Sequence, residues 1–312
     1  PVMKNVSLAM SAKDWSILIG LSILWGGSFF FNEITLTGFS PLTVVWLRVT
    51  IAAACLWFLV FAKNITIPKT GTFWWSIILM GLINNAMPFS LIVWGQQEIG
   101  SGLASILNAT TPLFTVLVAG ALLSDERIAP LKILGVLIGL GGVAAMIGPQ
   151  YLSGLGESVS AQLSILGAAL CYAFAGVFGR RFREMQVSPV MTATLQVSMA
   201  SLWLLPVCIF GGHVQELSTA NSSAWLAVAA LGTFCTALAY IGYFSLLSSS
   251  GATNLSLVTF LVPISAILLG WLFLGEQLKP IHYFGMACIF TGLAAIDGRP
   301  FKKLRQRKEK VL

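Results

Sequence analysis

Charged side chains are scarce in this chain of 312 residues. Lysine, arginine, aspartate and glutamate make up 9% of it, whereas hydrophobic residues make up 57%, and the mean hydropathy is +0.87. A soluble domain carries about 25% charged residues. The composition therefore excludes a chain that covers its own surface in water, and it points to a lipid bilayer as the solvent.

Residues for catalysis and metal binding are also few. The histidines, His213 and His282, stand alone, the five cysteines form no Cys-x-x-Cys pair, and H-E-x-x-H and G-x-S-x-G motifs are absent. The stretch GLGGVA at 139–144 fits a dinucleotide-binding pattern, but it lies inside an apolar run instead of following a strand. We therefore predict a protein that is not an enzyme and that has no metal site and no cofactor.

Long apolar runs dominate the rest of the sequence. A bilayer core about 30 Å thick needs about 20 apolar residues per helix. Ten stretches meet this need, at residues 14–33, 41–62, 73–96, 102–123, 130–148, 160–180, 189–210, 223–247, 253–274 and 280–297. They lack the period-two alternation of barrel strands. The sequence thus predicts an all-α integral membrane protein with ten transmembrane helices and no soluble domain.

The basic residues predict an orientation. Of the 18 lysines and arginines, all except Arg48 and Lys279 lie before the first stretch, in alternate connections or after the last stretch. Such residues mark the cytoplasmic side, so both termini are expected there. The basic tail, 299–312, then lies against an anionic leaflet. This placement accounts for the net charge of +7 without a nucleic acid partner.

One pattern occurs twice in the chain. PLFTVLVAGALLSDERI at 112–128 and PISAILLGWLFLGEQL at 263–278 share an opening proline, an apolar run and a glutamate. Matching residues at a similar spacing include Trp74 with Trp225 and Gly81 with Gly232. The pattern predicts two five-helix repeats, 1–149 and 150–298. Because five is odd, the repeats would be inverted around a central cavity, as in secondary transporters.

The segments LWGGSFF at 24–30 and SPLTVVWLR at 40–48, with the two proline-to-glutamate segments, resemble the drug/metabolite transporter superfamily in its EamA branch. Within that branch the sequence resembles the YddG-type exporters of aromatic amino acids. The resemblance covers nearly the whole chain. It implies an inner-membrane exporter of small metabolites that works by alternating access, with aromatic and other neutral amino acids favoured as substrates. A monomer is compatible with the sequence, which does not decide the oligomeric state.

Arg48 is the charged residue that lies deepest in a predicted span, about 10 Å into its helix at 1.5 Å per residue. Insertion of an arginine at mid-span costs about 2.5–3.5 kcal/mol, so Arg48 must face protein or a wet cavity. Two interpretations stay open. Arg48 anchors a substrate carboxylate, or it is a structural partner of Glu33, of Glu98 or of carbonyls at a helix end.

Other polar and aromatic residues lie far from the ends of the predicted spans and are candidates for the cavity wall. Tyr240 and Tyr243 share a helical face with Thr236. The remaining candidates are Asn84 and Asn85 in GLINNAMPF, Trp25 and Tyr172 at matching places, and Trp94 at an outer helix end. Aromatic walls would bury an apolar side chain of the substrate. Hydrogen bonding between helices is the competing interpretation.

Three prolines, Pro88, Pro112 and Pro263, are predicted kinks that hinge the closure of the cavity. Glu126 and Glu276 lie at helix ends, and we interpret them as markers of helix boundaries. Since no aspartate or glutamate is central in a span, facilitated movement is favoured over proton antiport, although the energy coupling stays open.

Two rival functions remain. The first is a carrier of another substrate class. Lipophilic cations would need a central carboxylate, and nucleotide-linked metabolites would need several buried basic residues, of which only Arg48 qualifies. A non-transporting scaffold, the other rival, needs no inverted duplication.

Overall fold

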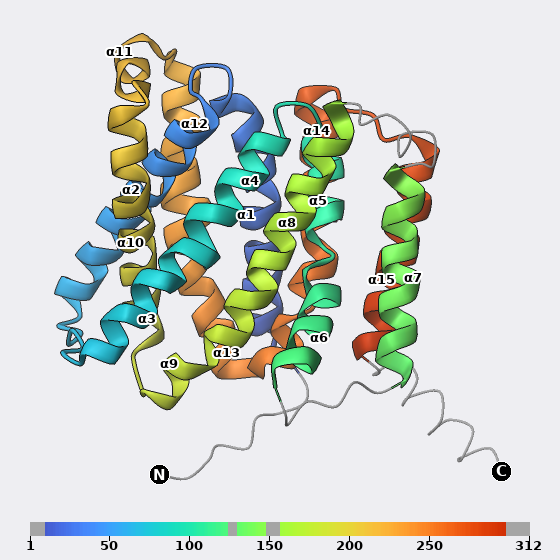
Figure 1. Cartoon of the computed structure of the whole chain (residues 1–312), viewed down its shortest axis with the longest axis horizontal. Helices are drawn as coiled ribbons and strands as arrows, with labels where there is room; N and C mark the ends of the chain where they lie inside the picture. Colours follow the sequence, from blue (N-terminus) through green and yellow to red (C-terminus); the bar gives the residue numbers. More distant parts are fainter. Residues whose placement is uncertain (1–9, 124–129, 148–156, 298–312) are drawn as a thin grey trace.

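A computed structural model describes residues 10–123, 130–147 and 157–297 (Figure 1), and in these ranges the regular structure is helical. The α-helices of eight or more residues are α1 (Ala12–Thr35), α2 (Pro41–Ala62), α3 (Gly71–Gly81), α4 (Met87–Gly95), α5 (Ser101–Asn108), α6 (Thr111–Leu122), α7 (Pro130–Ile147), α8 (Glu157–Phe178), α10 (Pro189–Phe210), α12 (Ser222–Gly232), α13 (Ala239–Leu255), α14 (Val258–Leu274) and α15 (Pro280–Asp297). Short helices are α9 (Arg180–Glu184), η3 (His213–Gln215) and α11 (Glu216–Thr219). The prediction of an all-helical protein is confirmed.

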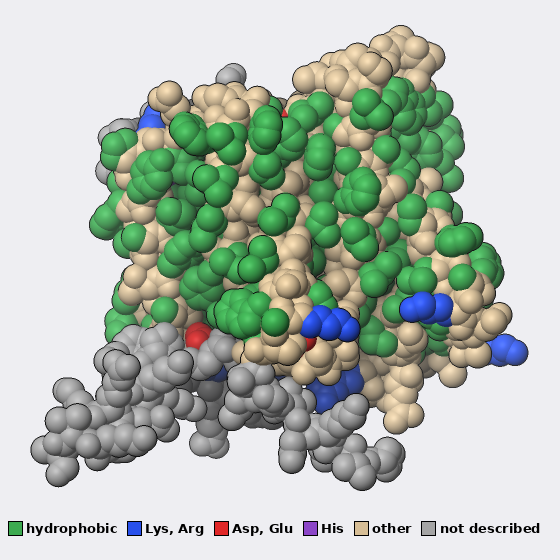
Figure 2. Space-filling view, turned by 180° about the vertical axis from the view of Figure 1, so that it is seen from behind, with side chains coloured by type: hydrophobic (Ala, Val, Ile, Leu, Met, Phe, Trp, Pro, Cys, Tyr) green, Lys and Arg blue, Asp and Glu red, His purple; other side chains and the backbone are tan. Residues whose placement is uncertain are grey.

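Many of these helices are suited to a bilayer. Within the described ranges, eight helical segments are long and apolar enough to cross a membrane, and α7 and α14 are apolar but shorter. Figure 2 shows hydrophobic side chains over the flank of the bundle, with most of the visible lysine and arginine at one end. Ten crossings, the inverted repeats and the side of the termini stay predictions.

Local sequence explains where several helices begin. Ser11 and Asp14 form a capping box at the start of α1: Asp14 N–H donates to Ser11 Oγ, and Ser11 N–H donates to Asp14 Oδ2, each at 3.1 Å. Pro41 and Pro189 lie in the first turn of α2 and α10, where the missing N–H has no intrahelical partner to lose. These caps stabilise the helix ends that the apolar runs predict.

Two of the long segments are interrupted by a π-helical turn, η1 (Leu82–Ala86) between α3 and α4 and η4 (Thr233–Leu238) between α12 and α13. In η1 the N–H of Met87 donates to Leu82 O, five residues back. Pro88 lies in the first turn of α4, directly after η1. A proline disturbs the helix at the carbonyl four residues back, here that of Asn84, so the predicted kink at Pro88 coincides with η1. The η4 turn has no proline at all. Such turns are frequent at functional sites.

The other two predicted kinks differ from each other. The stretch 102–123 is two helices, α5 and α6, and Pro112 lies in the first turn of α6, directly after the break at Ala109 and Thr110. Pro263 lies inside α14, which continues through it. The chain bends earlier there, at Gly251, whose φ is +76°. Pro88 and Pro112 therefore each follow an irregular turn directly, whereas Pro263 does not.

Helices from the two ends of the chain interleave: α1 packs against α14, α2 against α10 and α4 against α8. The pair of α7 and α15 stands at one side of the bundle (Figure 1). A Cβ added at Gly135 of α7 would lie 2.6 Å from Gly292 O of α15, and one added at Gly142 would lie 2.9 Å from Gly285 O. Glycines therefore let these two backbones touch, as small residues do between membrane helices.

Candidate functional site

Arg48 of α2 is buried, with 5% of its surface exposed. Its Nε–H donates to Thr236 Oγ1 of η4 at 2.9 Å, and its guanidinium carbon lies 3.9 Å from the centre of the Phe89 ring. The stacking on Phe89 is a cation–π contact. A guanidinium has five N–H donors, and the terminal amino groups of Arg48 donate to no residue that the structure describes. The terminal N–H groups of Arg48 are therefore available to bind an acceptor such as a carboxylate.

The acidic residues considered as partners of Arg48 lie elsewhere. Glu33 accepts a hydrogen bond from Gln96 Nε2 at 3.1 Å, and Gln96 Oε1 accepts from Asn32 Nδ2 at 2.8 Å. Glu98 is exposed. Among the described residues, no carboxylate lies within ion-pair distance of Arg48. The structural interpretation of Arg48 as half of an ion pair is not supported.

The asparagines of η1 reach two other helices. Asn84 Nδ2–H donates to Gln196 Oε1 of α10 at 3.1 Å, and Asn85 Nδ2–H donates to Tyr240 Oη of α13 at 2.9 Å. Asn85 is fully buried, and its Oδ1 has no hydrogen-bond partner among the described residues. An unpartnered buried acceptor is uncommon. Asn85 thus joins the cluster of polar groups around Arg48 through Tyr240, which lies near the Arg48 charge, and Asn84 is its neighbour in η1.

Aromatic rings continue this cluster along α13. Tyr240 stacks on Phe244 with ring centres 6.2 Å apart, Phe244 meets Tyr243 edge-on at 5.1 Å, and Tyr243 lies 5.7 Å from Trp25 of α1. Tyr172 of α8 packs against two hydrophobic clusters of the core and lies within electrostatic range of Arg48. The structure thus brings together every predicted cavity residue except Trp94.

Two glycines hold the π turns against their neighbours. A Cβ added at Gly81, just before η1, would lie 2.7 Å from Gln196 O, and one added at Gly232, just before η4, would lie 2.6 Å from Ile51 Cβ and 3.0 Å from Arg48 O. Contacts under 3.0 Å cannot form without a shift of the backbone. Glycine at these positions is what allows Arg48 and Gln196 to reach the turns.

Trp94 lies apart from the cluster and is 44% exposed. One hollow of the described structure, of about 400 Å³, lies beside Glu276, and another of about 300 Å³ lies between α1 and α13. None of the predicted cavity residues lines either hollow. The central cavity stays a prediction.

The predicted cavity residues do not include Gln196, Phe89 and Phe244, and they omit Thr236 although it is predicted to share one helical face with Tyr240 and Tyr243. Gln196 and Thr236 had a visible signal, because both are polar residues inside apolar runs. Phe89 and Phe244 had none, because phenylalanine is abundant throughout the chain.

Ser40, His213 and Glu216 meet at one end of the bundle without forming a catalytic relay. His213 Nδ1 lies 3.0 Å from both Ser40 Oγ and Glu216 Oε1, whereas a triad needs the serine and the acid on opposite ring nitrogens. Ser40 N–H donates to Glu216 Oε2 at 2.7 Å. Desolvation by burial raises the pKa of Glu216, but hydrogen bonds from Ser40 and His213 outweigh this effect and hold the pKa below its usual value. The carboxylate caps α2.

Comparisons with known proteins agree with one another. The model described as the EamA-like transporter family matches residues 15–148 and again residues 159–296. The uncharacterized transporter YoaV of Bacillus subtilis (strain 168) is 24% identical over 279 residues, which is 88% of this chain and 94% of YoaV. YdfC, an uncharacterized transporter of the same organism, is 27% identical over 309 residues, covering 96% of this chain and 94% of its own.

Two further matches extend the comparison. Protein PecM of Dickeya dadantii (strain 3937) is 24% identical over 92% of this chain and 93% of PecM. One solved crystal structure superimposes with a TM-score of 0.63 at 21% identity, covering 92% of this chain and 98% of that one. At this identity the likeness shows the fold alone.

Proposed function

The chain belongs to the EamA-like transporter family, and from this premise we propose that it is an inner-membrane secondary carrier that exports aromatic and other neutral amino acids by alternating access. As a family member it is a multi-pass membrane transporter of a small molecule. The cluster of Arg48, the two π turns and the rings of α13 is the proposed substrate site. Transport would be facilitated diffusion, driven by the concentration gradient of the substrate.

The packing supports an inverted repeat of 1–149 and 150–298. In this repeat α1 corresponds to α8 and α6 to α14, and α1 packs against α14 as α8 packs against α6. Likewise α3 corresponds to α12 and α2 to α10, and α3 packs against α10 as α12 packs against α2. The family model also matches once in each half. With five crossings per half, the halves would face opposite ways and meet at the substrate site.

The distribution of basic residues supports the orientation. The connection of α2 to α3, with Lys63 and Lys69, and the three arginines of α9 lie at the same end of the bundle (Figure 1). Lys279 lies in the α14–α15 connection at the opposite end. By the positive-inside rule, the end with α9 is cytoplasmic, and the end with Lys279 is called the outer end below.

Arg48 is the observation that carries the substrate proposal. A buried charge without a partner is strongly unfavourable, and a substrate carboxylate would supply that partner. The zwitterion of an amino acid also brings an ammonium group, for which the buried Oδ1 of Asn85 is an unused acceptor. The rings of Trp25, Tyr240 and Tyr243 would then contact an aromatic side chain.

The same observation weighs against the rival substrates. A lipophilic cation would meet the positive charge of Arg48 and find no carboxylate beside it among the described residues. A nucleotide-linked metabolite carries at least one phosphate group and would need several basic partners, whereas Arg48 is the basic residue of this cluster.

Counterflow in proteoliposomes tests the proposal. Vesicles loaded with unlabelled tryptophan, without a proton gradient, are expected to accumulate labelled tryptophan above protein-free vesicles. Excess phenylalanine should compete, and tryptamine, which lacks the carboxylate, should not. Failure of a correctly folded protein to exchange tryptophan, phenylalanine or leucine would remove the amino acid assignment and leave family membership intact.

A further inference from the structure

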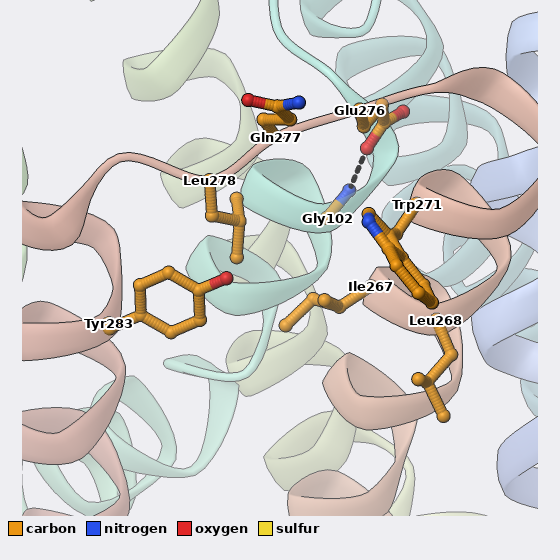
Figure 3. A pocket seen from close by; sticks show the side chains of 8 residues that line it. All are labelled: Gly102, Ile267, Leu268, Trp271, Glu276, Gln277, Leu278 and Tyr283. Atoms are coloured by element: carbon orange, nitrogen blue, oxygen red, sulfur yellow. Dashed lines mark hydrogen bonds between the residues drawn. The ribbon is translucent and has the colours of Figure 1, made fainter.

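The carboxylate of Glu276 bonds to the first turn of a helix far away in the sequence. Its Oε1 accepts from Ser101 N–H at 2.8 Å and its Oε2 accepts from Gly102 N–H at 3.0 Å (Figure 3). These N–H groups lack partners within α5, and the N-cap residue, Gly100, has no side chain to supply one. Glu276 therefore caps α5, where the helix dipole favours a negative charge.

Neighbouring glycines make room for this contact. A Cβ added at Gly270 would lie 2.5 Å from Glu276 Oε2, and one added at Gly100 would lie 3.0 Å from the same oxygen. Gly275, with φ +68°, turns the chain at the end of α14, so that Glu276 N–H donates to Gly270 O at 3.1 Å. The interpretation of Glu276 as a mere boundary marker is thus incomplete. Glu126, its partner in the repeated pattern, lies outside the described residues.

The contact restrains a short and separate element. α5 has eight residues and ends at the turn of Ala109 and Thr110, after which α6 starts in a new first turn. It packs against α14, α8 and α1. A tilt of α5 about that turn would open the bundle at the end where α14 finishes and leave α6 in place.

The surroundings allow the bond to break. The hollow of about 400 Å³ lies directly beside the carboxylate and is lined by Trp271, Leu278 and Tyr283, among others (Figure 3). No basic side chain among the described residues pairs with Glu276, although Lys279 follows three residues later. The carboxylate thus depends on α5 for its partners and has space into which it can swing.

We propose that Glu276 is the latch of the outer gate: its bonds to Ser101 N–H and Gly102 N–H hold α5 closed and break when the site opens to the outside. The proposal rests on the proposed function, because a gate presupposes a carrier with alternating access. Glu276 is a positioning residue in this cycle, since it acts through α5 and does not touch the substrate.

Cysteine accessibility measures the gate independently of transport. Cys235 lies in η4 beside the proposed site and is 1% exposed, so it reports opening once Cys55, Cys171, Cys208 and Cys288 are replaced by alanine. A membrane-impermeant maleimide is applied from the α14–α15 side and, in inverted vesicles, from the other side. Glu276→Gln should raise the labelling rate about tenfold or more from the α14–α15 side only, as expected of a shifted two-state equilibrium.

Two further variants make the test decisive. Glu98→Gln removes an exposed carboxylate from the connection between α4 and α5, close to the start of α5. It should leave labelling unchanged. Gly102→Pro removes one of the two donors at the second residue of α5, the position at which α4 and α6 carry Pro88 and Pro112. It should raise labelling in the same direction. This variant decides the matter if Glu276→Gln does not fold.

The outcomes separate the latch from the substrate assignment. Labelling at the wild-type rate in both latch variants overturns the latch, and so does an equal rise from both sides, which would indicate general loosening. One-sided labelling without tryptophan counterflow supports the latch and removes the amino acid assignment. Counterflow without a change in labelling does the reverse.

Discussion

The two π turns meet two crossing helices in nearly the same way. At η1, Asn84 donates a hydrogen bond to Gln196 of α10 at 3.1 Å, and at η4, Arg48 of α2 donates one to Thr236 at 2.9 Å. The crossing side chain is a neutral amide in one place and a guanidinium in the other. The backbone arrangement therefore occurs twice, whereas the charge occurs once.

The two contacts share their backbone arrangement and differ in the charge of the crossing side chain. A close glycine and a π turn are common to both places, so they form the frame on which the site is built. The charge belongs to α2 alone, and a carboxylate bound in the site would lie on that side. Under the proposed function, a symmetric frame with an asymmetric charge would orient a zwitterion, which a symmetric pair of amides would not do.

Substitutions that break the frame should have the largest effect. In Gly81→Val and Gly232→Val the new Cβ would lie within 2.7 Å of atoms of α10 or α2, and overpacking of this kind costs about 1–3 kcal/mol or more. Both variants should lose thermal stability in detergent, measured by size-exclusion chromatography after heating. Gly176→Val, where no atom lies within 4 Å, is the control, and equal losses in all three would refute the frame.

Arg48→Gln makes the two contacts chemically alike. Tryptophan counterflow should fall about tenfold or more, which corresponds to about 1.4 kcal/mol, with the melting temperature preserved, because a buried unpaired charge is removed. Gln196→Met is the matched variant at the neutral contact, and it should retain most of the counterflow. A loss of folding in Arg48→Gln without a selective loss of transport would assign Arg48 a structural role.

Tyr240→Phe tests the second hydrogen bond of η1. It removes the oxygen that accepts from Asn85 and leaves a buried amide without a partner, at a cost of about 1–3 kcal/mol. The melting temperature should fall accordingly. Tyr243→Phe, whose hydroxyl makes no hydrogen bond to the described residues, should change it little, and similar losses in the two variants would contradict this account of Asn85.

Pro88→Ala should have the smallest effect. Since η4 forms without a proline, η1 should persist once Pro88 is gone, and the free energy of unfolding should change by about 1 kcal/mol or less. Thermal stability and counterflow both measure this. A large loss would mean that the proline imposes η1, and the two turns would then have different causes.

The helices could be predicted from the sequence because the length of an apolar run sets the length of a helix in a bilayer. The π turns could not, since they accompany the close approach of Gly81 to α10 and of Gly232 to α2, and no local residue reveals such an approach. Pro88 directly follows η1, but no proline accompanies η4. The contact of Glu276 with α5 joins residues 175 positions apart. The sequence near α5 indicates it only by Gly100, an N-cap residue without a side chain that could cap the helix.

The site was predictable where chemistry alone marks a residue. Arg48, Asn84, Asn85 and Tyr240 are polar groups inside apolar runs, and the structure brings them together. Trp94 shows the limit of this reasoning, because composition does not tell which face of a helix is covered, and its ring lies partly exposed.

The glycine contact of α7 with α15 has a consequence for biosynthesis. α15 leaves the ribosome after α7, and at about 5–20 residues per second it follows α7 by roughly 8 to 30 seconds. Throughout that interval the glycine face of α7, with Gly135 and Gly142, has lipid in place of its partner. A nascent chain interrupted before Pro280 lacks α15 and leaves this glycine face without the helix that it packs against.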